Sequence, residues 1–393
     1  MYLSLEFDYY TIGIITLALL SAFFVGWWIS KHFSRVVMSV KEQNTEWLPD
    51  EQPKVSMIVY SCHGLDMLKE TLPSMLSQDY SNYEIVVVDD NYDIATKDYL
   101  NDLMLEHKNL YFTNIPQGTI NLSRKKLALT LGIKAAHGEF VLLTESNCKA
   151  QSPRWLALMM GKCQPGIDLV IGNTGHIDKK WYSVARTYYD YDQVTAKVRY
   201  LSYALNGDPY RADGCNMVIR RKLFFDIKGF SSTLNLHAGE DDLFVKQIAN
   251  SHNTKVQIAK DAQLQTYGTS SIRELRAFKL QHIFTEKYLD TFSKFSGALY
   301  LWLYWALLIS LVALLVMQPL NGAVWIFSAL VLFSVWGVQI FAFDRAATVL
   351  EYKPLRLRIP FFTMVAPGVN IWFRIIGHIN RKSNFTYQRK RQK

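Results

Sequence analysis

The sequence has few of the residues that mark disulfide-linked, fibrous or disordered proteins. Its 393 residues include 4 cysteines, 11 prolines and 20 glycines, whereas 50% of the residues are apolar. This composition can bury a large core, which excludes a disordered or fibrous chain. Four cysteines in 393 residues exclude a small disulfide scaffold, and a zinc ribbon has no support because no two cysteines form a Cys-x-x-Cys pair. The length predicts two or three structural units.

Outside its C-terminal tail the chain also lacks a strong excess of positive charge. The formal net charge is +9. Six basic residues and no acid lie between Arg381 and Lys393, which leaves +3 for the other 380 residues. Because the positive charge is local, it argues against a basic groove for nucleic acid, and no nucleic-acid partner is expected.

Three charge-free stretches are long enough to cross a membrane. The first runs from Tyr9 to Ser30, and acids precede it where a signal peptide would be basic, which favours an anchor. The 49 residues between positions 294 and 344 are interrupted by turn residues, and they predict helices over Ser296–Met317 and Ala323–Phe343. A fourth stretch, Ile359–Ile379, contains prolines and an arginine. We expect it to be a re-entrant or interfacial helix, with a full span as the alternative.

The charges that flank these segments predict the topology. No lysine or arginine precedes the first segment, but basic residues follow it and follow the helix pair: Lys31, His32, Arg35 and Lys41, then Arg345, Lys353, Arg356 and Arg358. The positive-inside rule therefore places the start of the chain outside and the next 260 residues or so in the cytoplasm. We expect a multi-pass protein of the inner (plasma) membrane whose basic loop and tail face anionic membrane lipids.

Between the membrane segments, short apolar runs alternate with helical stretches. Strands are expected over Val55–Tyr60, Tyr83–Val88, Leu110–Thr113 and Glu139–Thr144, with helices over 65–76, 97–106 and 123–136. This alternation predicts an α/β fold with a parallel sheet covered on both faces, which binds ligands at the carboxyl ends of its strands. Two strands end in polar residues, Asp89-Asp90 and Glu145-Ser146-Asn147. Each group taken alone is equally consistent with a cap, a turn or a solvated loop.

Several segments occur together in a fixed order. They are the strand that ends in Tyr60-Ser61, Gln78-Asp79-Tyr80 ahead of the strand that ends in Asp89-Asp90, the basic helix start Arg124-Lys125-Lys126, Glu145-Ser146-Asn147, Gly214-Cys215-Asn216-Met217 and Gly239-Glu240-Asp241-Asp242-Leu243. In this order the sequence resembles family-2 glycosyltransferases, which are inverting enzymes with a GT-A fold, a Rossmann-like and mostly parallel sheet. The resemblance covers Lys54 to about Tyr288.

The resemblance implies a role for each segment. Donor binding would fall to Tyr60, Ser61, Asp89, Asp90, Lys125, Lys126 and Glu145, and acceptor binding to Gly214 and Asn216. Asp241 would be the catalytic base, with Glu240 and Asp242 as the alternatives. A divalent ion, Mg²⁺ or Mn²⁺, would bind at Glu145 and Asn147. Nothing in the sequence names the sugar, and uridine as the nucleoside rests on the resemblance.

The chemistry of sugar transfer explains why such residues are needed. A departing nucleoside diphosphate leaves negative charge, which a divalent ion and basic side chains neutralise. Hard ions prefer oxygen ligands, and residues two apart in an extended segment share a face. Here the family's Asp-x-Asp position holds Glu145 and Asn147, so one carboxylate is replaced by an amide, which puts metal affinity in doubt. For Lys125 and Lys126, a solvated helix face is the alternative to phosphate binding.

Inversion requires a base that deprotonates the acceptor hydroxyl opposite the leaving group. Three consecutive acids, Glu240-Asp241-Asp242, repel one another unless they share a cation or bind hydroxyls. The alternative is a capped helix start, because acids favour that end and Leu243–Ala249 has a helical pattern. The same residues can serve both purposes.

A motif common in processive synthases, Gln-x-x-Arg-Trp, is absent. The matching stretch, 278–282, contains Lys279 and His282, which are candidates for phosphate contacts or ordinary surface residues. Ile272, Leu275 and Phe278 predict an apolar face on a helix at the bilayer. The missing motif and the small number of spans argue against a processive synthase.

Two functions follow as hypotheses. The first is a membrane-anchored glycosyltransferase that uses a cytoplasmic nucleotide sugar and a lipid-linked or membrane-proximal glycan acceptor. The second is a non-catalytic, donor-sensing or scaffold relative in a glycan assembly complex. The expected division of the chain is an anchor (1–30), a linker (31–52), a GT-A domain (53–270), an interfacial helix (271–294), a helix pair (295–343), and a basic loop, hydrophobic helix and tail (344–393).

Overall fold

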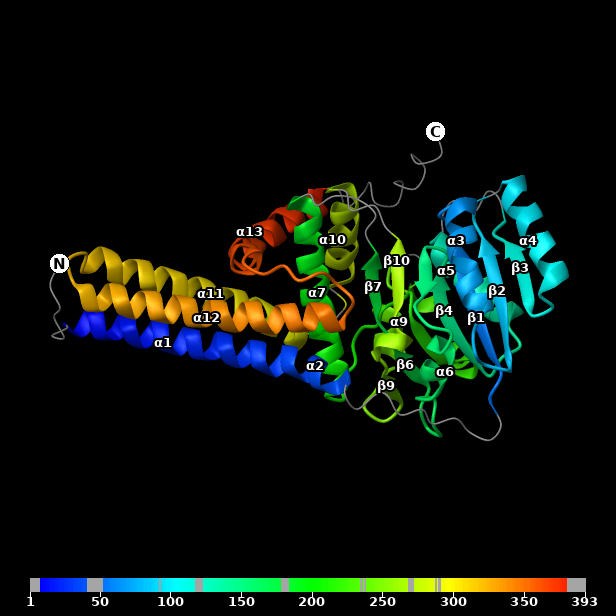
Figure 1. Ribbon diagram of the computed structural model, residues 1–393, viewed down its shortest axis with the longest axis horizontal. Coiled ribbons are helices and arrows are strands. Elements are labelled where there is room, and N and C mark those ends of the chain that lie inside the picture. Colours follow the sequence, from blue (N-terminus) through cyan, green and yellow to red (C-terminus); the bar gives the residue numbers. More distant parts are fainter. Residues whose placement is uncertain are drawn as a thin grey trace.

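The structure is a computed structural model, and it describes residues 8–40, 52–91, 93–116, 123–177, 184–233, 236, 238–267, 272–286, 288 and 291–379. A bundle of long helices extends from one side of an α/β domain (Figure 1). Parts of the predicted linker (41–51) and the basic tail (380–393) lie outside the described residues.

The α/β domain is built on a seven-stranded sheet in the order β3-β2-β1-β4-β8-β6-β9. Its strands are β1 (Val55–Ser61), β2 (Tyr83–Asp89), β3 (Leu110–Asn114), β4 (Phe140–Glu145), β6 (Leu169–Ile171), β8 (Met217–Arg220) and β9 (Thr254–Val256). The first four strands are mutually parallel, and β8 is antiparallel to both of its neighbours. The four strands expected from the sequence lie within one residue of their predicted bounds, and the mostly parallel sheet is confirmed.

Both faces of this sheet are buried, because alternate residues of each strand enter different cores. Val55, Met57 and Val59 pack in one core, whereas Ile58 and Tyr60 pack in the other. The covering helices are α3 (Leu65–Leu76), α4 (Ile94–Glu106), α5 (Arg124–Ala135), α6 (Trp155–Met160), α8 (Arg221–Asp226) and α9 (Leu243–Ile248). A covered parallel sheet explains why its strands are near-continuous apolar runs.

A second, three-stranded sheet lies beside the first. Its order is β5 (Cys148–Ala150), β10 (Leu264–Tyr267) and β7 (Thr174–Ile177). Short 3₁₀ segments occur at Ser231–Thr233 and Lys260–Ala262. These elements were not predicted, because each is only three or four residues long and carries little periodic pattern.

The long helices form a bundle of α1 (Tyr9–Ile29), α11 (Thr291–Met317) and α12 (Gly322–Val349). The first helix does not end at residue 30. It continues through a π-helical turn (Ser30–Ser34) into α2 (Arg35–Ser39), so the predicted linker begins later than expected. No proline or glycine interrupts this stretch, and its Phe33 and Val36 are buried. Trp28 stacks on Tyr300 with ring centroids 4.3 Å apart, which joins α1 to α11.

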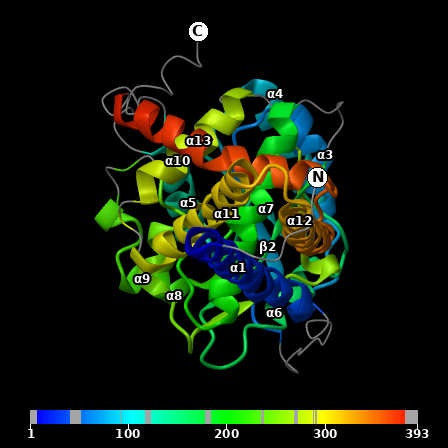
Figure 2. The ribbon, with the colours of Figure 1, turned by 90° about the vertical axis from the view of Figure 1, so that its left-hand side faces the viewer.

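Four helices are long and apolar enough to cross a membrane: Tyr9–Ser39, Phe295–Met317, Gly322–Val349 and Arg358–His378. The last belongs to α13 (Arg358–Ile379), whose mean hydropathy of 1.4 is well below the values of 2.1 to 2.3 of the others. In Figure 2, α13 runs across the bundle instead of alongside it. This arrangement agrees with the predicted interfacial helix, which stays a prediction.

Two further helices, α7 (Val184–Leu205) and α10 (Ile272–Glu286), stand between the bundle and the sheets (Figure 1). On α10, Leu275 is buried and Phe278 packs edge-on against Tyr189 of α7, whereas Ile272 is 70% exposed. The apolar face of α10, which was expected to contact the bilayer, therefore packs largely against other parts of the protein.

Candidate active site

The parallel register brings the predicted donor-binding residues to one edge of the sheet. Ser61 of β1 lies opposite Asp89 of β2, and Tyr60 lies opposite Glu145 of β4. The Tyr60 hydroxyl donates a hydrogen bond to Oδ2 of Asp90 at 2.9 Å. Strand ends that are far apart in sequence thus form one polar cluster, as expected for a sheet of this type.

Asn91, which the sequence analysis missed, joins two of these strand ends. Its amide nitrogen donates to Oδ1 of Asp89 at 2.6 Å and to Oγ of Ser61 at 3.0 Å. Its amide oxygen accepts from the backbone N–H of Gly64 at 3.1 Å, where the backbone has a φ of 87° that favours glycine. Burial raises the pKa of Asp89, against the opposing effect of the hydrogen bonds from Asn91.

Arg124, the first residue of α5, holds the carboxylate of Asp90. Its Nε donates to Oδ1 of Asp90 at 2.8 Å and to Oδ2 at 3.0 Å, and a second guanidinium nitrogen also contacts Oδ1. Ser123 caps this helix by accepting from the N–H of Lys126. Asp90 is therefore already engaged by Tyr60 and Arg124, and its contact with a nucleoside stays a prediction.

Lys125 connects the end of β4 to the acidic segment. Its Nζ lies 2.7 Å from Oε1 of Glu145 and 3.1 Å from Oε1 of Glu240. Burial alone would lower the pKa of Lys125, but the two carboxylates outweigh it and hold this pKa well above its usual value. For Glu145, burial raises the pKa, but Lys125, His63 and the side-chain hydrogen bonds from Lys125 and Cys215 together outweigh it, so the net shift is downward. The solvated-face alternative does not describe Lys125.

Lys126 points in another direction and has a different environment. Its side chain is fully buried, and its Nζ donates to the carbonyls of Thr233, Leu236 and Ala238 at 2.7, 3.0 and 2.8 Å. All three ammonium protons are thus used to hold the loop that precedes the three acids. Donor binding by Lys126 stays a prediction that this placement does not support.

Of the three acids, Asp241 is the one whose carboxylate makes no hydrogen bond with any described residue. It lies against Gly214, where a Cβ atom would be 2.9 Å from the Cβ of Asp241. Burial, followed by the neighbouring Asp242 and Glu240, raises the pKa of Asp241 to about 7, although Arg211 and Lys125 act in the opposite direction. A carboxylate with a pKa near neutrality is suited to act as a general base.

The other two acids have structural partners. Asp242 caps α9, since its Oδ1 accepts from the N–H of Leu243 at 2.7 Å, and its Oδ2 lies 3.6 Å from the guanidinium of Arg211. Glu240 is buried beside Lys125, and its Oε2 has no hydrogen-bond partner among the described residues. Of the three candidates for the base, Asp241 is therefore the one whose carboxylate remains available.

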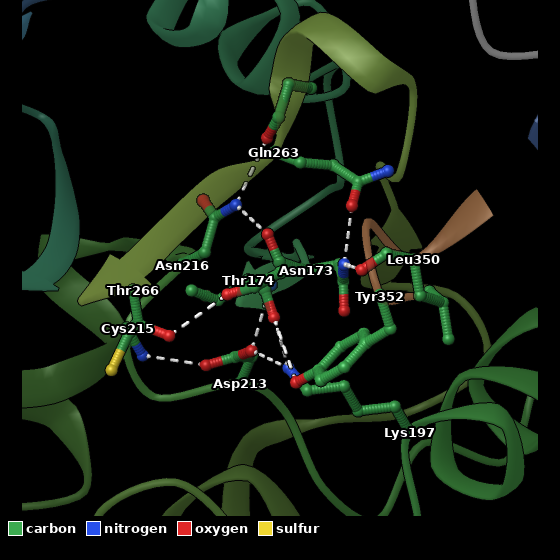
Figure 3. A network of polar contacts seen from close by, with 12 residues as sticks. Asn173, Thr174, Lys197, Asp213, Cys215, Asn216, Gln263, Thr266, Leu350 and Tyr352 are labelled. Atoms are coloured by element: carbon green, nitrogen blue, oxygen red, sulfur yellow. Dashed lines mark hydrogen bonds and ion pairs between the residues drawn. The ribbon is translucent and has the colours of Figure 1, made fainter. Parts of the chain in front are cut away.

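The segment around Gly214 is held by a network of polar contacts (Figure 3). Asp213 pairs with Lys197 of α7 and accepts from the N–H groups of Thr174 and Cys215. Lys197 also donates to the carbonyl of Thr174 at 3.0 Å. This ion pair could not be predicted from the sequence, because no local pattern distinguishes Lys197 or Asp213 from surface charges.

Asn216, a predicted acceptor-binding residue, lies inside this network and is fully buried. Its amide nitrogen donates to the carbonyls of Asn173 and Ala262, and its oxygen accepts from the indole N–H of Trp155 at 3.1 Å. A buried amide that is satisfied in this way positions the chain beneath the site. A direct contact between Asn216 and an acceptor stays a prediction without support from its placement.

The predicted metal ligands, Glu145 and Asn147, are both partly exposed, whereas Ser146 between them is buried. Among the described residues, no group of three or more His, Cys, Asp and Glu side chains is placed to hold an ion. Asn147 lies in the turn between β4 and β5, and two protein oxygens are too few for an independent site. They fit an ion that is held jointly with the oxygens of a donor diphosphate.

The comparisons with known proteins identify the domain. A family model described as "Glycosyl transferase family 2" matches residues 55–226. The chain carries a family-2 glycosyltransferase domain. The resemblance found in the sequence is thereby confirmed, and the matched residues include the strand ends, α5 and Gly214.

Two known proteins that this chain is similar to are informative. A segment of 127 residues, 31% of the chain, is 30% identical to the GalNAc(5)-diNAcBac-PP-undecaprenol beta-1,3-glucosyltransferase of Campylobacter jejuni, and it spans 38% of that protein. The structure is similar to that of the mannosyltransferase PcManGT from Pyrobaculum calidifontis in complex with GDP-Man and Mn²⁺, with a TM-score of 0.52 and 17% identity over 91% of this chain and 99% of that chain. The second likeness confirms the GT-A fold.

Proposed function

We propose that the protein is a membrane-anchored, inverting glycosyltransferase that transfers a sugar from a cytoplasmic nucleotide-sugar donor to a lipid-linked or membrane-proximal glycan acceptor. The observation that carries this proposal is the environment of Asp241. This carboxylate follows the matched residues 55–226 in the chain, makes no hydrogen bond with described residues, and has a pKa raised to about 7. Uridine as the nucleoside of the donor follows from the family resemblance.

In this mechanism Asp241 removes the proton from the acceptor hydroxyl. The acceptor oxygen attacks the anomeric carbon of the sugar from the face opposite the nucleoside diphosphate, and the bond from that carbon to the diphosphate oxygen breaks. The configuration at the sugar carbon is therefore inverted. Gly214 allows the main chain to approach Asp241 closely, which fixes the position of the carboxylate.

Lys125 supports the departure of the diphosphate. It is the cation placed between the end of β4 and the acidic segment, and its raised pKa keeps it charged at neutral pH. A divalent ion bound by Glu145, Asn147 and the diphosphate would neutralise the negative charge that develops on the leaving group. Lys125 and the ion would both stabilise the negative charge of the leaving diphosphate at the edge of the sheet where β1, β2 and β4 end.

The proposed acceptor and localisation rest on the helices. The four helices with the length and composition of membrane spans support a domain held at a bilayer, and the basic residues that flank them support the inner (plasma) membrane with the domain on the cytoplasmic side. The Campylobacter relative acts, by its name, on an acceptor linked to undecaprenol through a diphosphate. A lipid-linked acceptor agrees with both observations.

Transfer assays on the purified full-length protein test this function. Radiolabelled UDP-sugars and a membrane lipid extract are expected to give a labelled lipid product, and Asp241→Asn is expected to reduce its formation by about 10³-fold or more. Absence of transfer from every common donor, or equal transfer by Asp241→Asn and the wild type, would refute the proposal. A thermal melting curve of Asp241→Asn shows that the variant is folded.

The same preparation distinguishes the non-catalytic alternative. Calorimetry with UDP and UDP-sugars, with and without Mn²⁺, measures nucleotide binding independently of turnover. Tight binding that does not depend on a metal and leads to no transfer would favour a donor-sensing or scaffold subunit. Binding that is followed by transfer favours the enzyme.

A further inference from the structure

A cavity of about 560 Å³ lies where the helix bundle joins the glycosyltransferase domain. Its walls come mainly from α7, α10, α11 and α13, which meet in Figure 1 between the long helices and the sheets. The volume is in the range of sites that bind small molecules. None of the donor-binding residues named above lines it.

The cavity has one apolar side and one charged side. Trp302 and Trp305 of α11 and Ile371 of α13 belong to the apolar side, and all three are more than a third exposed. Because these helices have the composition of membrane segments, these exposed side chains would contact lipid chains in the proposed arrangement. The charged side contains Arg199 of α7 and Arg211, which lie toward the domain.

Most charges in the cavity are already paired. Lys279 contacts Asp192 and donates to the side-chain oxygen of Asn370 at 2.8 Å. Arg374 pairs with Glu286 at 2.8 Å. Arg211 contacts His282 and lies 3.6 Å from Asp242. Among the described cations that line the cavity, these pairs leave one without an ion-pair partner.

Arg199 is that cation. No carboxylate among the described residues lies within ion-pair distance of it, and its buried Nε has no hydrogen-bond partner there. Tyr210, which also lines the cavity, is the strongest electrostatic neighbour of Arg199, whereas Glu286 and Asp192 attract it less and are each engaged with another cation. The guanidinium rests against Gly297 of α11, where a Cβ atom would be 2.4 Å from it. A buried, unsatisfied guanidinium donor is costly unless a ligand accepts from it.

One short segment connects this cavity to the candidate base. Tyr210 and Arg211 line the cavity, and the N–H of the next residue, Ala212, donates to the carbonyl of Asp241 at 3.0 Å. Two residues farther on, Gly214 lies against the Asp241 side chain. A molecule in the cavity is therefore adjacent to the acidic segment in which the proposed base lies.

We propose that this cavity binds the head of the acceptor lipid, a phosphate or diphosphate on a long apolar chain, with Arg199 as its phosphate contact. The apolar side would hold the first part of the chain, and the guanidinium would donate to phosphate oxygens, which it matches in geometry. This proposal rests on the proposed function and names the acceptor class for it. The headgroup of an anionic phospholipid has related chemistry, so the experiment must separate the two sources.

Binding of farnesyl diphosphate to the detergent-purified full-length protein tests the proposal. Farnesol serves as the uncharged probe, and a short-chain phosphatidylglycerol serves as the phospholipid probe. We expect farnesyl diphosphate to bind at least tenfold more tightly than either. Equal affinity for farnesol would overturn the role of charge, and equal affinity for phosphatidylglycerol would overturn the assignment to an acceptor in favour of a general lipid site.

Variants locate the binding in the cavity. Arg199→Gln is expected to weaken farnesyl diphosphate binding about tenfold or more, whereas Arg276→Gln, on an exposed part of α10 outside the cavity, is the matched control. Gly297→Ala keeps the charge but displaces the guanidinium, and only the flexible end of Arg199 has to move. We expect it to weaken binding as well, unlike Gly337→Ala, where nothing lies within 4 Å. Unchanged binding in both Arg199→Gln and Gly297→Ala would overturn the proposal.

These measurements do not use a donor, so they are independent of the transfer reaction. If farnesyl diphosphate binds as expected and no donor supports transfer, the assignment of the cavity as a lipid-phosphate site is upheld and the proposed function is refuted. If transfer to a lipid is observed and Arg199→Gln leaves both probe binding and the KM for the lipid unchanged, the function stands and this cavity is not the acceptor site.

Discussion

The pH dependence of transfer should report the unusual environment of Asp241. With a pKa of about 7, the base is about 9% ionised at pH 6 and about 91% ionised at pH 8, so kcat/KM should rise about tenfold between these values. With the ordinary pKa of 3.8, the base would be ionised throughout this range and the rate would be flat. We expect kcat/KM to rise and not to fall with pH, because the active form of a general base is the deprotonated one.

Two substitutions should move this profile in opposite directions. Glu240→Gln removes a negative neighbour that raises the pKa of Asp241, so the midpoint of the pH profile of this variant should fall below pH 7. Arg211→Gln removes a cation that lowers this pKa, so its midpoint should lie above that of the wild type. Lys125, Lys126 and Asp242 also face this group and remain unchanged in both variants.

The assay is the initial rate of transfer at low donor concentration, from about pH 5.5 to pH 8.5, because kcat/KM then reports the free protein. Buffers overlap in pH and share one ionic strength, so that screening is constant. A flat profile in the wild type would refute the assignment of the pKa. Shifts of the same sign in both variants would refute the electrostatic explanation.

Four further outcomes are expected. Gly214→Ala should lower kcat about 100-fold by displacing Asp241, in contrast to Gly26→Ala, which meets no atom within 4 Å; equal rates would contradict the close approach. Lys126→Met should destabilise the fold by about 3 kcal/mol, because it leaves three buried carbonyls without their donor, whereas exposed Lys134→Met should leave the melting temperature unchanged. EDTA should abolish transfer and Mn²⁺ should restore it. Asn147→Asp, which replaces an amide ligand by a carboxylate, should need less Mn²⁺ for this restoration. Full activity in EDTA would exclude a role for a metal. A membrane-impermeant maleimide should label Leu320→Cys in intact cells but Leu105→Cys only after permeabilisation, and the reverse pattern would invert the topology.

The parallel part of the sheet could be predicted from the sequence because its strands are continuous apolar runs between helical segments. The position of Asp89, Asp90 and Glu145 at one edge followed from the geometry of parallel sheets. The three-residue strands β5, β6 and β9 could not be predicted, since their formation depends on partners that are distant in sequence.

The roles of neighbouring polar residues were harder to separate. Lys125 and Lys126 are adjacent on α5, and successive helix residues point in different directions, so one reaches Glu145 and the other reaches the carbonyls before the acids. Which lysine faces the site depends on how α5 docks, and the sequence pattern does not contain this information. Asn216 illustrates the same limit, because a buried amide satisfied by carbonyls looks like a binding residue in the sequence.

The polar network of Figure 3 also bears on how the protein selects its acceptor. Asn173 donates to the carbonyl of Leu350, Gln263 donates to that of Val349, and the Tyr352 hydroxyl donates to that of Thr174. These contacts join the end of α12 to the two sheets beneath the site. With the long helices in a bilayer, as proposed, a domain fastened in this way would hold Asp241 at one height above it. For a glycan on a lipid anchor, we expect this fixed height to limit which hydroxyl can reach the base. The acceptor hydroxyl would then be selected by its distance from the membrane as well as by its chemistry.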